Sequence, residues 1–249
     1  MRVLIGVPCA RVVRSQFFLD VLNWTDESKH RIRILPNNSA GRIDWSRSQL
    51  IDAALAWNAD LHLQIDTDVN PMIPLQTAMS FINQDFSRGF DMVIGPTVGV
   101  NGRVMNNYGP NFKPPENFAS SCFEIWAGAF GFVAMSPRLI KKVTSSPPAS
   151  NIVDIGDKKH PIYMIYREGT TEDFDFCTRV REMGFKVGCD PRLEMGHAKE
   201  VMLRPDWKRH TGAGPGTNPN EPNIMLEDNE TGAVRSLGKW IPLGGETPA

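Results

Sequence analysis

The sequence lacks the features that mark membrane, disulfide-rich and nucleic-acid-binding proteins. No apolar run approaches the ~20 residues of a transmembrane helix. The four cysteines are scattered without a Cys-x-x-Cys pair, so neither a zinc knuckle nor a disulfide framework is predicted. A net charge of −1 gives no general attraction to nucleic acid or to anionic membranes. The N-terminus has only a short apolar run and does not resemble a secretory signal, so we expect a cytoplasmic protein.

What is present is typical of a globular α/β domain. The chain has 249 residues, of which 41% are hydrophobic, and this is enough to bury a sizeable core. Short apolar runs alternate with segments of helical periodicity. Strands are predicted at 3–7, 31–35, 61–65, 91–96, 126–135, 161–166 and 185–189. Helices are predicted to begin at Ser15, Ser46, Pro74, Ser136 and Glu172.

The composition changes near residue 200, which divides the chain into a domain at 1–200 and an irregular C-terminal tail at 201–249. The tail opens with basic and aromatic residues and continues into a run rich in Gly, Pro and Asn at 211–223, which does not favour regular structure. We expect the tail to wrap the domain, to stay mobile, or to act as a lid over a cleft. The basic and aromatic residues that could reach such a cleft are Arg204, Trp207, Lys208, Arg209 and His210.

Two acids follow the apolar run at 61–65, in the sequence Asp66-Thr67-Asp68. If both acids are still extended, Asp66 and Asp68 point to the same side, and two hard oxygen ligands at this spacing can hold a divalent cation. The carboxyl end of a strand is also where ligands bind to α/β sheets. The alternative is a polar strand exit that leads into an Asx turn.

Three other positions are candidates for ligand binding. Ser46 to Gln49 has the form of a capping box, so Arg47 would lie in the first turn of a helix and could meet a phosphate or a ribose. A solvated arginine at a helix start is the alternative. Pro8 breaks the first strand where a ligand-facing loop would begin. Gly128 lies among small residues that permit close approach of a ligand or, equally, tight packing.

Three motifs stand in order along the chain: "LHLQIDTDV", "EGTTEDFDFCTRVREMGFKVGCDP" and "MGH". Together they resemble the nucleotide-sugar-dependent glycosyltransferases of the GT-A fold, especially the family-two-like members, over roughly residues 1–200. The resemblance implies a Rossmann-like domain whose central sheet is mostly parallel and flanked by helices. It also implies transfer of a sugar from a nucleoside-diphosphate sugar to an acceptor hydroxyl.

The resemblance assigns a role to each motif. Asp66, Asp68 and His197 would bind Mn²⁺ or Mg²⁺, and Asp66 could alternatively hold the ribose. Asp173 would be the general base, which implies inversion at the anomeric carbon, with Glu172 as the second choice. The first loop matches the position at which the family contacts the nucleobase, and UDP is assumed because it is commonest in the family. Residues expected on the donor side are Pro8, Ala10, Arg11, Arg47, Asp66, Thr67 and Gly128.

The sequence departs from the processive polysaccharide synthases of the family, because it has no Gln-x-x-Arg-Trp motif and no transmembrane run. A soluble single-transfer enzyme is expected, and its acceptor could be a saccharide, a protein, a small molecule or a modified DNA base. A nucleotidyltransferase is the nearest alternative, although the segment after the first strand lacks the usual glycine-rich, basic signature. A non-catalytic nucleotide-binding or sugar-binding module is the third interpretation.

Overall fold

The structure is a computed structural model, and the chain in it divides into two units, Met1–Ala198 and Lys199–Ala249. The residues that it describes are 1–9, 15–26, 29–38, 42–97, 106–107, 120–146, 152–155, 158–165, 169–197, 201–205, 224–228 and 234–237.

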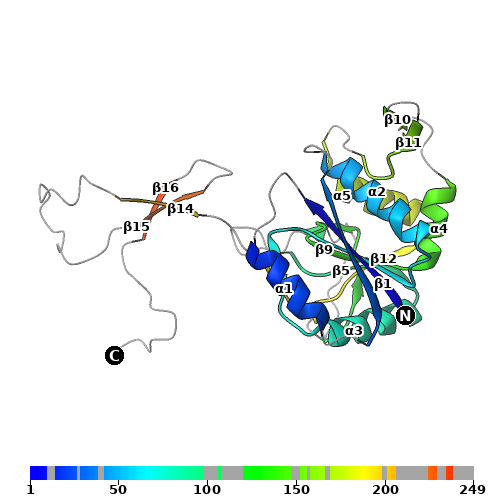
Figure 1. The fold of residues 1–249 in the computed structure, drawn as a ribbon, viewed down its shortest axis with the longest axis horizontal. Helices are drawn as coiled ribbons and strands as arrows, with labels where there is room; N and C mark the ends of the chain where they lie inside the picture. Colours follow the sequence, from blue (N-terminus) through cyan, green and yellow to red (C-terminus); the bar gives the residue numbers. More distant parts are fainter. Residues whose placement is uncertain are drawn as a thin grey trace, which may run out of the picture. The chain divides into compact units, whose positions relative to one another are not determined.

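The first unit is built on a seven-stranded sheet with the strand order β2-β1-β3-β9-β5-β12-β7 (Figure 1). Strand β1 is parallel to both β2 and β3, and β12 is parallel to β5. Strand β9 lies antiparallel between β3 and β5, so these two strands point the same way. The strands β2, β1, β3, β5 and β12 therefore share one direction, and their carboxyl ends form one edge of the sheet. The sheet strands are β1 (Arg2–Cys9), β2 (Arg31–Asn38), β3 (Leu61–Ile65), β5 (Phe90–Ile94), β7 (Phe123–Glu124), β9 (Phe132–Met135) and β12 (Lys186–Cys189).

Helices cover both faces of this sheet (Figure 1). One apolar cluster joins one face to α2, α4 and α5, and a second cluster joins the other face to α1 and α3. Strand residues alternate between the two clusters: Leu4 belongs to the first, whereas Val3 and Ile5 belong to the second. The helices are α1 (Ser15–Asp26), α2 (Ile43–Ala56), α3 (Leu75–Ser87), α4 (Pro137–Ser145) and α5 (Glu172–Glu182).

Three short strand pairs lie outside the main sheet. Strand β13 pairs with β4, β6 pairs with β8, and β10 pairs with β11, all antiparallel. Their bounds are β4 (Val69–Pro71), β6 (Asn106–Asn107), β8 (Ala127–Gly128), β10 (Ile152–Ile155), β11 (Lys158–Pro161) and β13 (Met195–His197).

The predicted α/β class with a mostly parallel, helix-flanked sheet is confirmed, and two of the boundaries that differ concern predicted site residues. Strand β1 does not stop at Pro8: Pro8 is buried and in register with Asn37 of β2. Helix α2 begins at Ile43, before the predicted cap at Ser46. The Ser46 amide already makes a helical hydrogen bond to the Arg42 carbonyl, and its hydroxyl donates to the Asn37 carbonyl at 2.7 Å. Ser46 is therefore an interior helix residue that ties α2 to β2.

The strand predicted at 161–166 is wrong, because β11 ends at Pro161 and Ile162 to Ile165 form no strand. The backbone amides of Tyr163 and Met164 donate to the Ser48 hydroxyl on α2, at 3.0 and 3.3 Å. The Tyr163 hydroxyl donates to Asp52 on the same helix at 2.7 Å. Side chains of α2 take the hydrogen bonds that a neighbouring strand would otherwise supply.

The second unit contains a three-stranded antiparallel sheet, in the order β14-β15-β16, that the expectation of an irregular tail did not include. The strands are β14 (Val201–Pro205), β15 (Ile224–Asp228) and β16 (Val234–Leu237). The predicted hairpin at 98–105, the basic residues after 205 and the run at 211–223 lie outside the described residues.

Within the described ranges, no helix has the length and apolar content needed to cross a membrane. All four cysteines are free: Cys9 is half-buried, and Cys122, Cys177 and Cys189 are buried. Burial raises the pKa of the Cys122 and Cys177 thiols well above the ordinary value.

Two buried carboxylates meet between α3 and the end of β12. Asp85 and Asp190 are both fully buried, and Arg192 donates to Asp85 at 3.1 Å and to Asp190 at 2.8 Å. The partly exposed Arg88 lies 3.6 Å from Asp85. Burial and the neighbouring Asp190 carboxylate together raise the pKa of Asp85 to about 7, against the opposing charges of Arg192 and Arg88. The folded protein therefore holds a proton on Asp85 at pH values where the unfolded chain has lost it.

This pKa shift predicts that stability falls as pH rises. An unfolded aspartate titrates near ~4, so the folded state binds more protons between about pH 4 and pH 7, and the free energy of unfolding decreases across that window. Asp85→Asn should remove this contribution, which is on the order of a few kcal/mol. Urea denaturation of wild type and Asp85→Asn at pH 5 and pH 8 measures this contribution. The free energy of unfolding should fall less between the two pH values in the variant than in wild type.

Asp60→Asn is the matched control. Asp60 is exposed and its pKa is lowered by hydrogen bonds from Arg2, so its contribution changes below pH 4 and not in the measured window. An equal loss of stability in wild type and Asp85→Asn would contradict the assignment.

Candidate functional site

The acids Asp66 and Asp68 lie in a tight turn at the end of β3. The strand ends at Ile65, and the Val69 amide closes the turn by donating to the Asp66 carbonyl at 3.1 Å. The two acids are therefore not both extended, which corrects the geometry assumed from their spacing. Thr67 lies between them and is half-buried, as are both acids. The next strand, β4, begins directly after Asp68.

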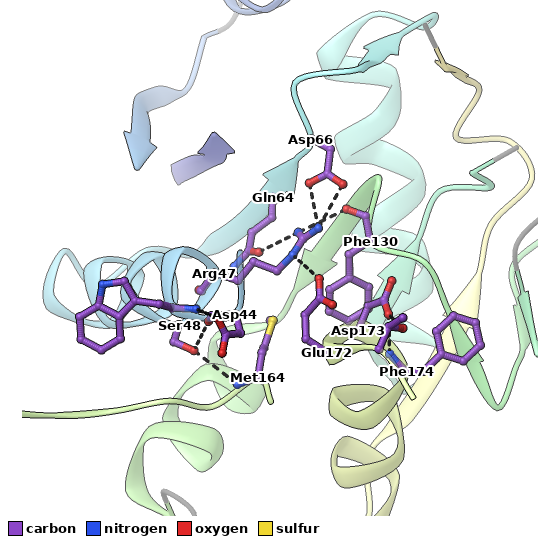
Figure 2. Close-up of polar contacts among 12 residues, drawn as sticks. Asp44, Arg47, Ser48, Gln64, Asp66, Phe130, Met164, Glu172, Asp173 and Phe174 are labelled. Atoms are coloured by element: carbon purple, nitrogen blue, oxygen red, sulfur yellow. Dashed lines mark hydrogen bonds and ion pairs between the residues drawn. The ribbon is translucent and has the colours of Figure 1, made fainter. Parts of the chain in front are cut away.

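Arg47 is buried and directed at this turn. It lies in the second turn of α2, its side chain is 3% exposed, and its Nη2 donates to the two Asp66 carboxylate oxygens at 2.8 and 3.1 Å. Arg47 is therefore neither at the helix start nor solvated, and its expected contact with a phosphate or a ribose stays a prediction. The guanidinium also lies over the Phe130 ring, 5.6 Å from its centroid, and 3.6 Å from a Glu172 oxygen (Figure 2).

The face of β3 that lies under α2 is polar. The interpretation of the whole run at 61–65 as apolar missed this face. His62 and Gln64 are fully buried and share this face with Asp66. Gln64 donates to the Arg47 carbonyl at 3.1 Å and accepts from Arg47 Nη1 at 3.4 Å. Burial lowers the pKa of His62 to about 4, so the ring is neutral at pH 7. The alternation of polar residues at 62, 64 and 66 is the sequence signal that could have revealed this face.

Glu172 and Asp173 open α5, as predicted, but their environments differ. Glu172 is 6% exposed and faces Arg47. Asp173 is half-buried, accepts a hydrogen bond from the Phe174 amide at 2.8 Å and a short one from the Thr171 hydroxyl. Figure 2 shows both side chains beside Phe130, on the side of Arg47 that faces away from Asp66. Asp173 is thus held at the helix start while remaining accessible.

The backbone of His197 is brought next to the acidic turn. Strand β13 pairs with β4, and His197 is in register with Val69, the residue after Asp68. The oxygen-rich donor set of Asp66 and Asp68 suits a divalent cation such as Mn²⁺ or Mg²⁺, although Arg47 already contacts both Asp66 oxygens. Among the described side chains, which do not include that of His197, no group of three or more His, Cys, Asp or Glu residues is arranged to hold a metal ion.

The surroundings of Asp66 disfavour the charged form of its carboxyl. Burial, aided by the nearby Asp68 and Glu172 carboxylates and opposed by Arg47, raises the pKa of Asp66 to about 6. Two carboxylates, those of Asp66 and Glu172, thus share one guanidinium, and the Asp68 carboxylate acts on Asp66 as well. A cation bound at this sheet edge would favour the charged form of Asp66.

Of the remaining predicted donor residues, the structure describes Pro8 and Gly128. Pro8 is part of β1, and Ala10 and Arg11 lie outside the described residues. Gly128 is buried in β8, where an added Cβ would lie 2.5 Å from the Asn106 side-chain oxygen and 3.1 Å from Ile125. Of the two explanations for this glycine, the structure favours tight packing over close approach of a ligand. Phe130, whose ring and carbonyl both contact Arg47, belongs to the site and was missed.

No protein-family model matches the chain, and no curated protein matches it. Solved structures with a similar arrangement include A197 from STIV, with 16% identity and a TM-score of 0.49 over 82% of this chain and 97% of that one. Another is a CMP:2-keto-3-deoxy-manno-octonic acid synthetase complexed with CTP, with 8% identity and a TM-score of 0.43 over 80% and 93% of the two chains. A third, from Desulfovibrio desulfuricans G20 and described as a nucleotide-diphospho-sugar transferase, has 10% identity and a TM-score of 0.39 over 75% and 78%.

The packing at Gly128 gives a test of its role. Gly128→Ala places a methyl group against Asn106, so we expect the free energy of unfolding to fall by about 1–3 kcal/mol. Asn106→Ser in the same chain shortens the opposing side chain and should recover part of the loss, measured by urea denaturation. A variant with unchanged stability and weaker nucleotide binding would instead favour a ligand contact.

Proposed function

We propose that the chain is a metal-dependent glycosyltransferase that moves a sugar from a nucleoside-diphosphate sugar, with UDP as the first nucleotide to test, to an acceptor hydroxyl. The observation that carries this proposal is the meeting of two acidic segments at the carboxyl edge of the sheet. Asp66 follows β3, Glu172 opens α5, and both contact the same guanidinium. Ligands of open α/β sheets bind at this edge.

Asp173 is the general base in this proposal. The acceptor hydroxyl needs a group that takes its proton while its oxygen forms a bond to the anomeric carbon and the bond from that carbon to the diphosphate oxygen breaks. Asp173 is accessible and oriented by its two hydrogen bonds, whereas Glu172 is buried against Arg47. Direct displacement of this kind inverts the anomeric configuration.

Asp68 and His197, with Asp66 as a further ligand or as a ribose contact, would hold Mn²⁺ or Mg²⁺. The ion, when bound, would stabilise the negative charge that develops on the departing diphosphate. The pairing of β13 with β4 supports this choice, because it fixes the backbone of His197 beside the residue that follows Asp68. The protein contributes a fixed edge on which donor and acceptor can be aligned.

The product of the reaction tests the function. Purified protein is incubated with labelled nucleotide sugars, Mn²⁺ and a panel of saccharide, peptide, small-molecule and hydroxymethylated-DNA acceptors. We expect release of nucleoside diphosphate, and we expect Asp68→Ala to lose both this release and the Mn²⁺-dependent thermal shift caused by nucleoside diphosphate. Release of pyrophosphate would instead identify a nucleotidyltransferase, and binding without turnover would identify a non-catalytic module.

The base assignment predicts a specific kinetic defect. Asp173→Asn keeps an acceptor oxygen for the helix start but cannot take a proton, so kcat should fall by ~10²–10⁴-fold while nucleotide-sugar affinity changes little. Glu182→Gln, an exposed position at the other end of α5, is the control and should keep wild-type kcat. NMR of the product should show inversion, and a retained anomeric configuration would exclude the role given to Asp173.

A further inference from the structure

Arg47 makes contact with both acidic segments of the candidate site from a buried position. Its Nη2 donates to both oxygens of Asp66, and its Nε lies 3.6 Å from a Glu172 oxygen. Asp66 belongs to the exit of β3 and Glu172 to the start of α5, which are distant in sequence. The guanidinium is therefore the point at which these two segments are joined (Figure 2).

The surroundings of Arg47 hold its guanidinium against Asp66 and Glu172. The Phe130 carbonyl and the Gln64 side-chain oxygen both accept from Nη1 at 3.4 Å, and the Phe130 ring lies against the guanidinium. Only 3% of the side chain is exposed. A guanidinium enclosed in this way has little surface left for a phosphate of the donor.

We propose that Arg47 is a positioning residue that holds Asp66 on the donor side and Glu172 on the acceptor side at a fixed separation, an inference that rests on the function proposed above. The two contacts differ in kind. Asp66 is fixed by two directional hydrogen bonds, whereas Arg47 Nε has no hydrogen-bond partner and Glu172 is held by charge alone. Glu172 is the first residue of α5, and Asp173 is the next residue in the chain.

Lysine cannot replace arginine in this arrangement. An ammonium group is a compact point charge, whereas the planar guanidinium presents donors in a fixed fork that reaches two carboxylates at once. Arg47→Lys therefore keeps the charge but loses one of the two contacts. A misplacement of about 1 Å in an active site can cost ~10²-fold in rate, so we expect kcat to fall by about that factor.

The experiment compares Arg47→Lys, Arg47→Met, Glu172→Gln and the double variant Arg47→Met with Glu172→Gln. Arg138→Met is the matched control: Arg138 also pairs with a carboxylate that is 4% exposed, that of Asp91, but outside the candidate site. For each protein we would measure the urea midpoint, the Mn²⁺-dependent thermal shift by UDP, and kcat and donor KM.

We expect Arg47→Lys to lower kcat by ~10²-fold with a smaller rise in donor KM, and Arg138→Met to lose stability without losing kcat. Glu172→Gln should lower kcat by less than ~10-fold. The double variant should be no worse than Arg47→Met alone, because residues that act through one another do not have additive effects. If Arg47→Met does not fold, the same comparison is made with Arg47→Lys in its place.

Two results would overturn the proposal. One is an Arg47→Lys protein with wild-type kcat and donor KM. The other combines two observations. The losses in kcat multiply in the double variant, and Arg47→Lys keeps its kcat while its donor KM rises. This pattern indicates that Arg47 binds the donor directly. Should the wild type release no nucleoside diphosphate, the proposed function fails. The urea midpoints still test the joining role of Arg47. They show whether the effect of Arg47→Met on stability changes when Glu172 is replaced as well.

Discussion

A buried guanidinium between two carboxylates is the interaction on which the geometry of the candidate site depends. Burying an arginine is costly unless its charge is paired and most of its donors are used. Asp66, Gln64 and the Phe130 carbonyl meet that requirement at Arg47. They come from a strand exit and a strand entrance, so α2 must sit over β3 and β9 in one position. The cost of burying the charge thereby becomes a constraint on the placement of the helix.

The same guanidinium lies between acids from two distant segments, Asp66 and Glu172. Carboxylates this close repel one another, and Asp66, with its raised pKa, shows that repulsion and burial together outweigh the attraction of Arg47. Such an edge stays folded because the core beneath it is well packed: one face of β3 contributes Leu61, Leu63 and Ile65 to a buried cluster. A carboxyl with a raised pKa at the edge where ligands bind α/β sheets is among the features from which the cation site was proposed.

Much of the fold could be predicted from periodicity, because α3, α4, α5 and β12 each have a clear apolar pattern and clear ends. The failures have tertiary causes. The Ser48 hydroxyl binds the backbone of Tyr163 and Met164, so a strand-like sequence forms no strand. The order of motifs along the chain drew attention to Asp66 and Glu172, which the structure brings to the same guanidinium. The role expected of Arg47 could not follow from its neighbours in sequence, since its partners lie in distant segments and its burial depends on Phe130.

The position of β9 in the sheet has a consequence for how the chain folds. Strands β3 and β5 do not pair with each other, and β9, which follows them in sequence, fills the space between them in the opposite direction. Until residues 132–135 have been made, a growing chain therefore has two hydrophobic strands whose facing backbone groups lack a partner, and such edges can pair with other chains. Insertion of a late strand between two early ones also requires contacts between residues far apart in sequence, which slows folding. The growing chain thus carries open, hydrophobic strand edges at the centre of its sheet until the middle strand is synthesised.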